Sequence, residues 1–464
     1  MALFDFSSYR DDIALIGDSG EKMSYQQLQE EADILKNKVQ NRGLCFCFCS
    51  NSIPSIIGYV GFIQAHIPTL LLDTNKDEDM IQHLIDIYHP MYLWKPIYHT
   101  GQDEIIHKYG NYALYKCHDD NMVFHPDLSL LLTTSGSTGS PKLVRLTEKN
   151  LLCNAESIIE YLQISKEERA ITSLPMYYSF GMSVINSHLH AGASLILTDC
   201  SILQAPFWKL VKEWKATSLA GVPYTYEMLR RLRFFKMDLP YLKTMIQAGG
   251  KLNAKIVKEY IEQSQANGKK FIVMYGQTEA APRMSYLPFE KALEKYSSIG
   301  IAIPGGEFFI IDSNGEKITH PFIDGELVFK GANVCMGYAE NPADLAKGDE
   351  NEGILHTGDI AQFDEEGYYY ITGRMKRFVK IWGNRCNLDS IEQLVKKYTQ
   401  DCACVGVDNK VTVFITEQGL DDKILNYLTE KTGLNAIAFV IRQIDKIPKK
   451  DTGKLDYRLL EAMI

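Results

Sequence analysis

Short buried strands that alternate with amphipathic helices are the feature that most limits the fold of this chain. Apolar or alternating runs predict strands at 45–49, 130–132, 194–199, 218–222 and 271–274. Apolar residues at helical spacing predict helices at 24–40, 77–89, 147–162 and 253–265. This alternation predicts an α/β fold, with a mainly parallel sheet that is covered by helices on both faces. Ligands of such folds bind beyond the carboxyl ends of the strands.

The pattern changes near residue 300. Short strands separated by Gly and Asp turns predict a β-rich subdomain over about 300–375, arranged as a small barrel. Residues 376–464 mix helical and strand patterns and predict a small α+β domain. A length of 464 residues suits two or three domains. We therefore expect a large N-terminal domain over 1–375 and a small C-terminal domain over 376–464.

Composition excludes several classes of protein. The net charge of −9, without a basic stripe, argues against nucleic acid as a partner. No apolar run approaches the roughly 20 residues of a membrane span, and the first residues do not resemble a signal peptide. Cys45, Cys47 and Cys49 alternate with phenylalanines, as on a strand, and they lack the spacing of metal ligands. We expect reduced, buried thiols and a cytoplasmic protein.

The strand at Leu130–Leu132 runs into a loop rich in Thr, Ser and Gly that ends in Pro141-Lys142. Such a loop offers backbone N–H groups, hydroxyls and one ammonium group to phosphate oxygens. The spacing of its glycines differs from that of the kinase and GTPase phosphate loop, which has Gly, four residues and then Gly-Lys-Ser/Thr. A nucleotide is therefore expected here, with different chemistry.

This loop, Thr-Ser-Gly-Ser-Thr-Gly-Ser-Pro-Lys, resembles the phosphate loop of the adenylate-forming superfamily. That superfamily includes acyl- and aryl-CoA synthetases, peptide-synthetase adenylation domains and luciferases. The resemblance implies that the β- and γ-phosphates of ATP are held by Thr134, Ser135, Gly136, Ser137, Thr138, Gly139 and Lys142. It also implies that Thr138 belongs to the site of Mg²⁺.

Other segments resemble the same superfamily in the same order along the chain. In Tyr275-Gly-Gln-Thr-Glu279 the resemblance implies that Tyr275 stacks on the base, Thr278 contacts phosphate and Glu279 binds Mg²⁺. Small residues upstream, Ala248, Gly249 and Gly250, resemble the segment beside the adenine and the acyl group.

His356-Thr-Gly-Asp359 and the later Gly373-Arg374 resemble the ribose-binding segment of the superfamily. By that resemblance Asp359 binds the ribose and Arg374 the nucleotide. Lys376 matches the pivot of the small domain, where many relatives have Asp. The same resemblance assigns Gly383 to the thiol tunnel.

Thr452-Gly-Lys454-Leu-Asp456 resembles the segment that carries the catalytic lysine. The resemblance implies that Lys454 brings the carboxylate and the α-phosphate together. The expected reaction forms an acyl-adenylate from an acid and ATP, followed by transfer to a thiol of CoA or of a carrier-protein phosphopantetheine. Transfer to an amine or hydroxyl, and an inactive nucleotide-binding regulator, stay open as alternatives. The oligomeric state is open between monomer and homodimer.

The identity of the acid depends on Ser179-Phe180-Gly181. Amino-acid-activating relatives have Asp at the position of Gly181, so the sequence argues against an α-amino acid. Acyl and aryl relatives have His where this chain has Tyr178, so the usual pocket gate is altered. Core packing of these aromatic residues is the alternative to a pocket. We expect a modest, mostly apolar acid surrounded by Tyr178, Phe180, Gly181, Ala248, Gly249 and Ala280.

Overall fold

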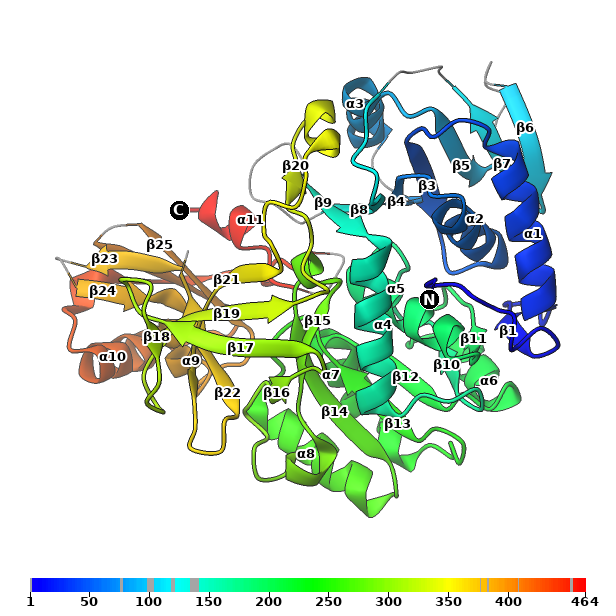
Figure 1. Cartoon of the computed structure of the whole chain (residues 1–464). Coiled ribbons are helices and arrows are strands. Elements are labelled where there is room, and N and C mark those ends of the chain that lie inside the picture. Colours follow the sequence, from blue (N-terminus) through cyan, green and yellow to red (C-terminus); the bar gives the residue numbers. More distant parts are fainter. Residues whose placement is uncertain are drawn as a thin grey trace. The chain divides into compact units, whose positions relative to one another are not determined.

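The computed structural model (Figure 1) describes residues 2–75, 78–97, 104–117, 122–133, 142–375, 377–381, 384–407, 409–450 and 454–464. Two compact units make up the chain. The first contains Met1–Tyr296, Ala302–Glu307 and Lys330–Leu355. The second contains Ser297–Ile301, Phe308–Phe329 and His356–Ile464. No helix among the described residues combines the length and the apolar character that crossing a membrane requires.

One sheet of the first unit has its parallel strands in the centre. Its order is β20 (Tyr338–Ala339), β9 (Leu143–Thr147), β8 (Leu128–Thr133), β4 (Thr69–Asp73), β3 (Cys45–Cys49), β5 (Tyr92–Pro96), β7 (Tyr112–Lys116) and β6 (Glu104–Tyr109). Strands β8, β4, β3 and β5 are parallel. The helices of this region are α1 (Tyr25–Lys38), α2 (Ile53–Gln64) and α3 (Glu78–Tyr88). Helices α1 and α2 pack on each other.

Strand β3 is buried on both faces, as the alternation predicts. The thiols of Cys45, Cys47 and Cys49 pack into one core cluster. The rings of Phe46 and Phe48 pack into another. The expectation of buried thiols is thus confirmed at this strand, and helices on both sides of a sheet explain why neither face is polar.

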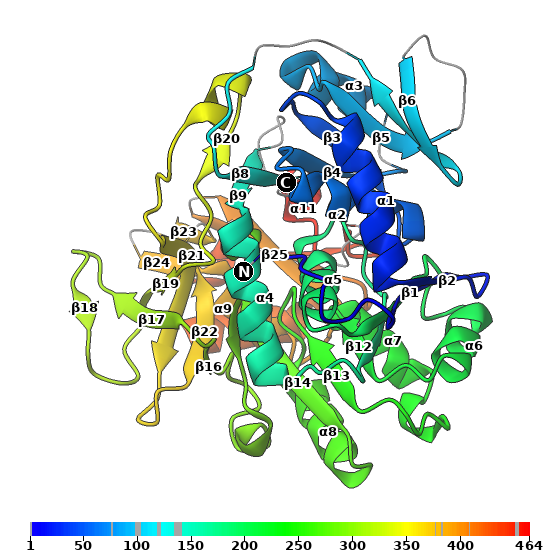
Figure 2. The ribbon, with the colours of Figure 1, turned by 45° about the vertical axis from the view of Figure 1, so that its right-hand side comes forward.

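The other sheet of the first unit contains the strand that leads into Tyr275–Glu279. Its strands of three or more residues are β15 (Arg283–Tyr286), β14 (Lys270–Gly276), β13 (Thr244–Gln247), β12 (Ser218–Gly221), β10 (Arg169–Ile171), β11 (Ser194–Ile196), β1 (Ile13–Ile16) and β2 (Lys22–Ser24), in this order. Its helices are α4 (Glu148–Leu162), α5 (Ser179–His190), α6 (Ala205–Glu213), α7 (Pro223–Arg231) and α8 (Ala254–Ala266). Helices α4 and α5 lie side by side (Figures 1 and 2).

Local sequence explains where several helices begin and end. The Ser24 side chain accepts a hydrogen bond from the Gln27 N–H at 3.2 Å and caps α1. Asn253 caps α8 in the same way, and Gly268 follows the end of that helix with a positive φ. The predicted helices and strands of this unit are confirmed to within a few residues.

The second unit corrects one expectation, because its β-rich part is an open sheet and not a barrel. The strands run in the order β18 (Lys317–Ile318), β17 (Gly306–Ile311), β19 (Gly325–Gly331), β21 (Ile354–Phe363) and β22 (Tyr369–Arg374). The edge strand β18 has two residues, too few to make the staggered pairing that closes a barrel.

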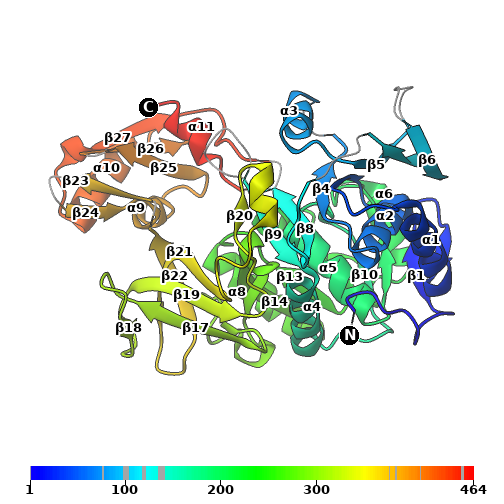
Figure 3. The ribbon, with the colours of Figure 1, turned by 45° about the horizontal axis from the view of Figure 1, so that its top comes forward.

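The C-terminal part of the second unit combines two small sheets with helices. One sheet pairs β23 (Phe378–Ile381) with β24 (Asn384–Asn387). The other contains β25 (Cys402–Val407), β26 (Lys410–Ile415) and β27 (Phe439–Gln443). Figure 3 shows this sheet with α9 (Leu388–Val395), α10 (Asp421–Thr432) and α11 (Tyr457–Glu461). The mixture of helical and strand patterns expected over 376–464 is confirmed.

Short elements complete the described chain. They are β16 (Ile301–Ala302) and the 3₁₀ helices η1 (Phe234–Lys236), η2 (Thr278–Ala280), η3 (Phe289–Lys291), η4 (Pro342–Ala346) and η5 (Ala436–Ala438).

Candidate functional site

The carboxyl end of β14 leads directly into Thr278 and Glu279. The strand ends at Gly276, and residues Thr278–Ala280 form the 3₁₀ turn η2. The Thr278 hydroxyl lies 3.0 Å from the hydroxyl of Ser179, the first residue of α5. A strand end and a helix N-terminus therefore meet at Thr278, which is the usual place of a ligand in an α/β fold.

Glu279 connects the two sheets of the first unit through Tyr338. The Tyr338 hydroxyl donates to Glu279 Oε1 at 2.7 Å. Tyr338 lies on β20 and pairs with Val144 on β9, so this contact reaches the strand that follows the Ser/Thr/Gly loop. Burial, together with the Glu279 carboxylate, raises the pKa of Tyr338 well above its usual value. Tyr338 therefore stays protonated and can donate to the carboxylate at neutral pH.

Lys142 lies beside the same strand. Its Nζ is 2.5 Å from Glu340 Oε1 and 5.8 Å from the centre of the Tyr338 ring. The end of the Ser/Thr/Gly loop is thus brought close to Glu279 through Tyr338. The other loop residues expected to hold phosphate, Thr134, Ser135, Gly136, Ser137, Thr138 and Gly139, lie outside the described residues.

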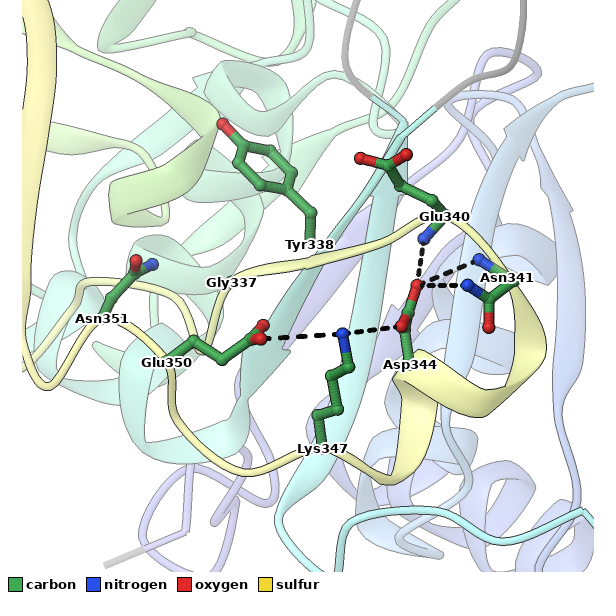
Figure 4. Close-up of a pocket in the computed structure, with 8 residues that line it drawn as sticks. All are labelled: Gly337, Tyr338, Glu340, Asn341, Asp344, Lys347, Glu350 and Asn351. Atoms are coloured by element: carbon green, nitrogen blue, oxygen red, sulfur yellow. Dashed lines mark hydrogen bonds and ion pairs between the residues drawn. The ribbon is translucent and has the colours of Figure 1, made fainter.

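A polar cavity of about 420 Å³ adjoins Tyr338. It is lined by Gly337, Tyr338, Glu340, Asn341, Asp344, Lys347, Glu350 and Asn351 (Figure 4). Lys347 lies between Asp344 and Glu350, at 2.8 Å and 3.7 Å from their carboxylates. Hydrogen bonds from Lys347 lower the pKa of Asp344. The charges lining this cavity are therefore already paired to a large extent.

Arg145 binds the backbone of the segment that lines this cavity. Its side chain is fully buried, and Nη2 lies 2.6 Å from the Glu350 carboxylate. Nε, Nη1 and Nη2 donate to the carbonyl oxygens of Tyr338, Lys347 and Met336 at 3.1, 2.6 and 2.9 Å. Arg145 therefore fixes the segment that carries the partner of Glu279.

The segment at 248–250 approaches Tyr178. Gly249 has a φ of +81°, and a Cβ atom there would lie 2.5 Å from the Tyr178 hydroxyl. Only glycine allows both this backbone conformation and this approach. Buried Gln247 donates to the carbonyl oxygens of Ala248 and Gly250 at 3.3 and 3.0 Å and fixes the turn. The side-chain amide of Gln277 donates a hydrogen bond to the hydroxyl of Tyr275 at 3.3 Å.

The expected acid pocket is densely packed. Phe180 and Ala280 are buried, and the rings of Tyr178 and Phe180 are 6.3 Å apart, edge to face. The position of a Cβ atom on Gly181 is occupied by the carbonyl oxygen of Pro175. An aspartate at that position would clash with the backbone, so the missing carboxylate of amino-acid-activating enzymes is also sterically excluded here.

In the second unit the β21–β22 pair brings two predicted nucleotide-binding residues together. Arg374 Nε lies 2.8 Å from Asp359 Oδ1, and the two residues are direct cross-strand partners. Asp359 is buried, whereas the Arg374 side chain is 61% exposed. The backbone N–H of Asp359 donates to the Thr357 hydroxyl at 3.1 Å, which fixes this turn.

Lys454 also belongs to the second unit. It is exposed, and its carbonyl oxygen accepts a hydrogen bond from the N–H of Lys450 at 2.8 Å. Asp456, two residues after Lys454, caps α11, because its side chain accepts a hydrogen bond from the N–H of Leu459 at 3.2 Å. The predicted pivot, Lys376, and the predicted tunnel residue, Gly383, lie outside the described residues.

A family model described as "AMP-binding enzyme" matches residues 5–339. The chain belongs to the AMP-binding enzyme family. This agrees with the resemblance found in the sequence motifs.

The relatives that resemble this chain are named for different reactions. Feruloyl-CoA synthase of an Amycolatopsis species is 27% identical over 71% of this chain and 68% of its own length. Luciferin 4-monooxygenase of Nipponoluciola cruciata is 26% identical over 73% of this chain, which spans 64% of that protein. The solved structure of Bacillus subtilis O-succinylbenzoate coenzyme A synthetase with AMP superposes with a TM-score of 0.80 at 18% identity, covering 97% and 95% of the two chains. The last likeness shows that the fold is that of this family.

Sequence reasoning gave no role to Tyr338, Arg145 or Arg283, although the structure places all three around the site. Tyr338 follows Gly337 in a pattern that resembles a family turn, which was the available signal. Among the described residues, no group of three or more His, Cys, Asp and Glu side chains could hold a metal ion.

Proposed function

We propose that the protein is an ATP-dependent acid–thiol ligase that first forms an acyl-adenylate and pyrophosphate, and then a thioester. The observation that carries the proposal is the convergence of Thr278 and Glu279 with Tyr338 and Lys142, which come from two different sheets. Thr278, Glu279 and Lys142 belong to motifs expected to contact phosphate or Mg²⁺, and Tyr338 contacts Glu279. A carboxylate needs such activation because oxide is a poor leaving group.

Glu279 fits a Mg²⁺ ion, because a carboxylate oxygen is a hard ligand and phosphate oxygens of ATP supply others. The sequence resemblance assigns Thr138 to the same ion, which when bound would neutralise charge on the phosphates. Tyr338 orients the Glu279 carboxylate, and Thr278 offers a hydroxyl to the phosphate chain. The residues at 134–139 and Lys142 would hold the pyrophosphate as it leaves.

The nucleotide would be bound by further residues. Tyr275, Gly249 and Gly250 would contact the base, while Asp359 accepts hydrogen bonds from the ribose and Arg374 contacts the nucleotide. Lys454 would stabilise negative charge where the carboxylate attacks the α-phosphate.

The second step requires a different arrangement. We propose that 376–464 is a mobile domain that pivots at Lys376, so that Lys454 withdraws after adenylation. A thiol could then enter past Gly383. The names of several relatives specify CoA as the acceptor, which favours CoA over the phosphopantetheine arm of a carrier protein.

The acid is proposed to be an acyl or aryl acid without an α-amino group. Tyr178, Phe180, Gly181, Ala248 and Ala280 would surround it. The carbonyl oxygen of Pro175 fills the place where an aspartate would hold an α-ammonium group, so such a cation would lack its partner.

The test is acid-dependent ATP–pyrophosphate exchange with a panel of fatty, aryl, dicarboxylic and amino acids, followed by thioester formation on free CoA or a supplied holo-carrier. Lys454→Ala should slow exchange at least about 100-fold and largely spare thiolysis of a preformed acyl-adenylate. Lys450→Ala, on the same segment, is the matched control. Exchange with no acid in the panel would refute the proposal, and equal loss of both half-reactions would refute the role of Lys454.

A further inference from the structure

Arg283, the first residue of β15, is a fully buried cation without an anionic partner among the described residues. Its Nε donates to the Ser183 hydroxyl at 3.1 Å, and Nη1 lies 2.7 Å from the sulfur of Met274. The guanidinium carbon is 4.2 Å from the centre of the Phe180 ring. Nη2 is buried and has no hydrogen-bond acceptor in the described part of the chain.

The contrast with Arg145 shows how this fold treats a buried arginine that supports structure. Arg145 is equally buried, but it pairs with the Glu350 carboxylate and with three carbonyl oxygens. A guanidinium group stays protonated in proteins, and burying it without an anion is costly. The neighbours of Arg283 are uncharged: the Ser183 hydroxyl, the Met274 thioether, the Phe180 ring and the hydroxyls of Tyr161 and Tyr178.

The surrounding titratable groups do not supply the missing negative charge. Burial raises the pKa of both Tyr161 and Tyr178 to about 12, so both hydroxyls are neutral at pH 7. Burial and the nearby Arg283 lower the pKa of His188 to about 4, so this ring is neutral as well. The described residues around Arg283 therefore offer no countercharge, and a bound anion would supply one.

The position of Arg283 relates this cation to the proposed site. Its Nε partner, Ser183, follows Ser179 by four residues on α5, and the Ser179 hydroxyl contacts Thr278. Four residues of an α-helix rise about 6 Å. Arg283 and Thr278 thus contact the same helix at positions about one turn apart, and Arg283 also packs against Phe180, a residue expected to contact the acid.

We propose that Arg283 is a specificity-determining residue that binds a second carboxylate of the acid substrate, so that the substrate is a dicarboxylic acid with a short spacer. The inference rests on the proposed function, in which the first carboxylate reacts near Thr278. A second carboxylate would satisfy Nη2 and the charge together, and a guanidinium group can bind it through two hydrogen bonds. A simple alkyl chain would leave both unsatisfied.

The test compares pyrophosphate exchange supported by α,ω-dicarboxylic acids of increasing length with that supported by monocarboxylic acids of the same length. We expect the wild-type kcat/KM for the best diacid to exceed that of its matched monoacid at least about 100-fold. Arg283→Met should abolish this preference by lowering activity with the diacid, while activity with the monoacid stays within a few fold. Arg283→Lys should give an intermediate preference, because it keeps the charge and loses the fork.

A second measurement depends on no variant. The best diacid should raise the melting temperature of the wild-type protein in the absence of ATP, and its matched monoacid should not. Exchange that is equal for diacids and monoacids, or an unchanged diacid preference in Arg283→Met, would overturn the inference and leave the proposed function intact. Absence of exchange with every acid would instead refute the proposed function.

Discussion

The guanidinium carbon of Arg377 lies 3.5 Å from the centre of the Tyr457 ring. The Tyr457 hydroxyl donates to Glu392 at 3.1 Å, and Arg377 Nη2 lies 3.3 Å from the same carboxylate. Arg377 follows the proposed pivot, Lys376, and Tyr457 lies three residues after Lys454. The three side chains therefore connect the segment of Lys454, the proposed catalytic lysine, to the residue next to the proposed pivot.

Loss of this contact should loosen the Lys454 segment. We expect Tyr457→Ala to slow pyrophosphate exchange about tenfold, with the effect mainly on kcat, since a cation–π contact and a hydrogen bond to a charged group are each worth about 1–2 kcal/mol. Tyr457→Phe keeps the ring and should lose only part of this rate. Thiolysis of preformed acyl-adenylate serves as the internal control. Wild-type exchange rates in Tyr457→Ala would show that this contact does not position Lys454.

Tyr338→Phe tests the hydrogen bond to Glu279. Without this hydroxyl the Glu279 carboxylate loses a hydrogen bond that orients it and is worth about 1 kcal/mol. The Mg²⁺ concentration at half-maximal exchange should therefore rise roughly fivefold. The phenylalanine ring keeps the packing beside Lys142. A titration of exchange with Mg²⁺ at saturating ATP measures the effect. An unchanged Mg²⁺ requirement would show that Tyr338 does not help Glu279 to bind Mg²⁺.

The sequence predicts those parts of the candidate site whose residues are close together in the chain. Tyr275–Glu279 directly follows the apolar strand β14, so both its position at a strand end and its chemistry can be read locally. Asp359 and Arg374 lie on adjacent strands separated by a short turn, and they pair directly. In each case the sequence distance is short enough for periodicity and motif to determine the geometry.

The missed residues depend on contacts between distant segments. Arg283 lies in a sequence segment of mixed polar and apolar residues, where an arginine normally faces solvent. It is buried because it packs against α5, about 100 residues upstream. Arg145 is buried because a loop nearly 200 residues later folds over it. The barrel prediction failed for a similar reason, since short strands with turns do not reveal whether edge strands such as β18 are long enough to pair.

Arg145→Met should destabilise the first unit. The substitution leaves three buried or half-buried carbonyl oxygens, of Met336, Tyr338 and Lys347, without their donor, and we expect a loss of at least about 3 kcal/mol in the free energy of unfolding. Glu350→Gln is the matched control. It keeps an oxygen acceptor at a half-exposed position and should cost about 1 kcal/mol. Denaturant unfolding of both variants measures the difference, and equal losses would contradict the scaffold role of Arg145.

His188 should make stability depend on pH. Its Nδ1 donates to the Val184 carbonyl oxygen at 2.8 Å, and burial lowers its pKa to about 4 from an ordinary value near 6.5. Between these values the unfolded chain binds a proton that the folded protein does not, so the free energy of unfolding falls as the pH falls, by roughly 3 kcal/mol at pH 4. His188→Asn can still donate to Val184 and does not titrate. Its unfolding free energy, measured from pH 7 to pH 4.5, should fall less steeply than that of the wild type, and parallel curves would exclude His188 as the source.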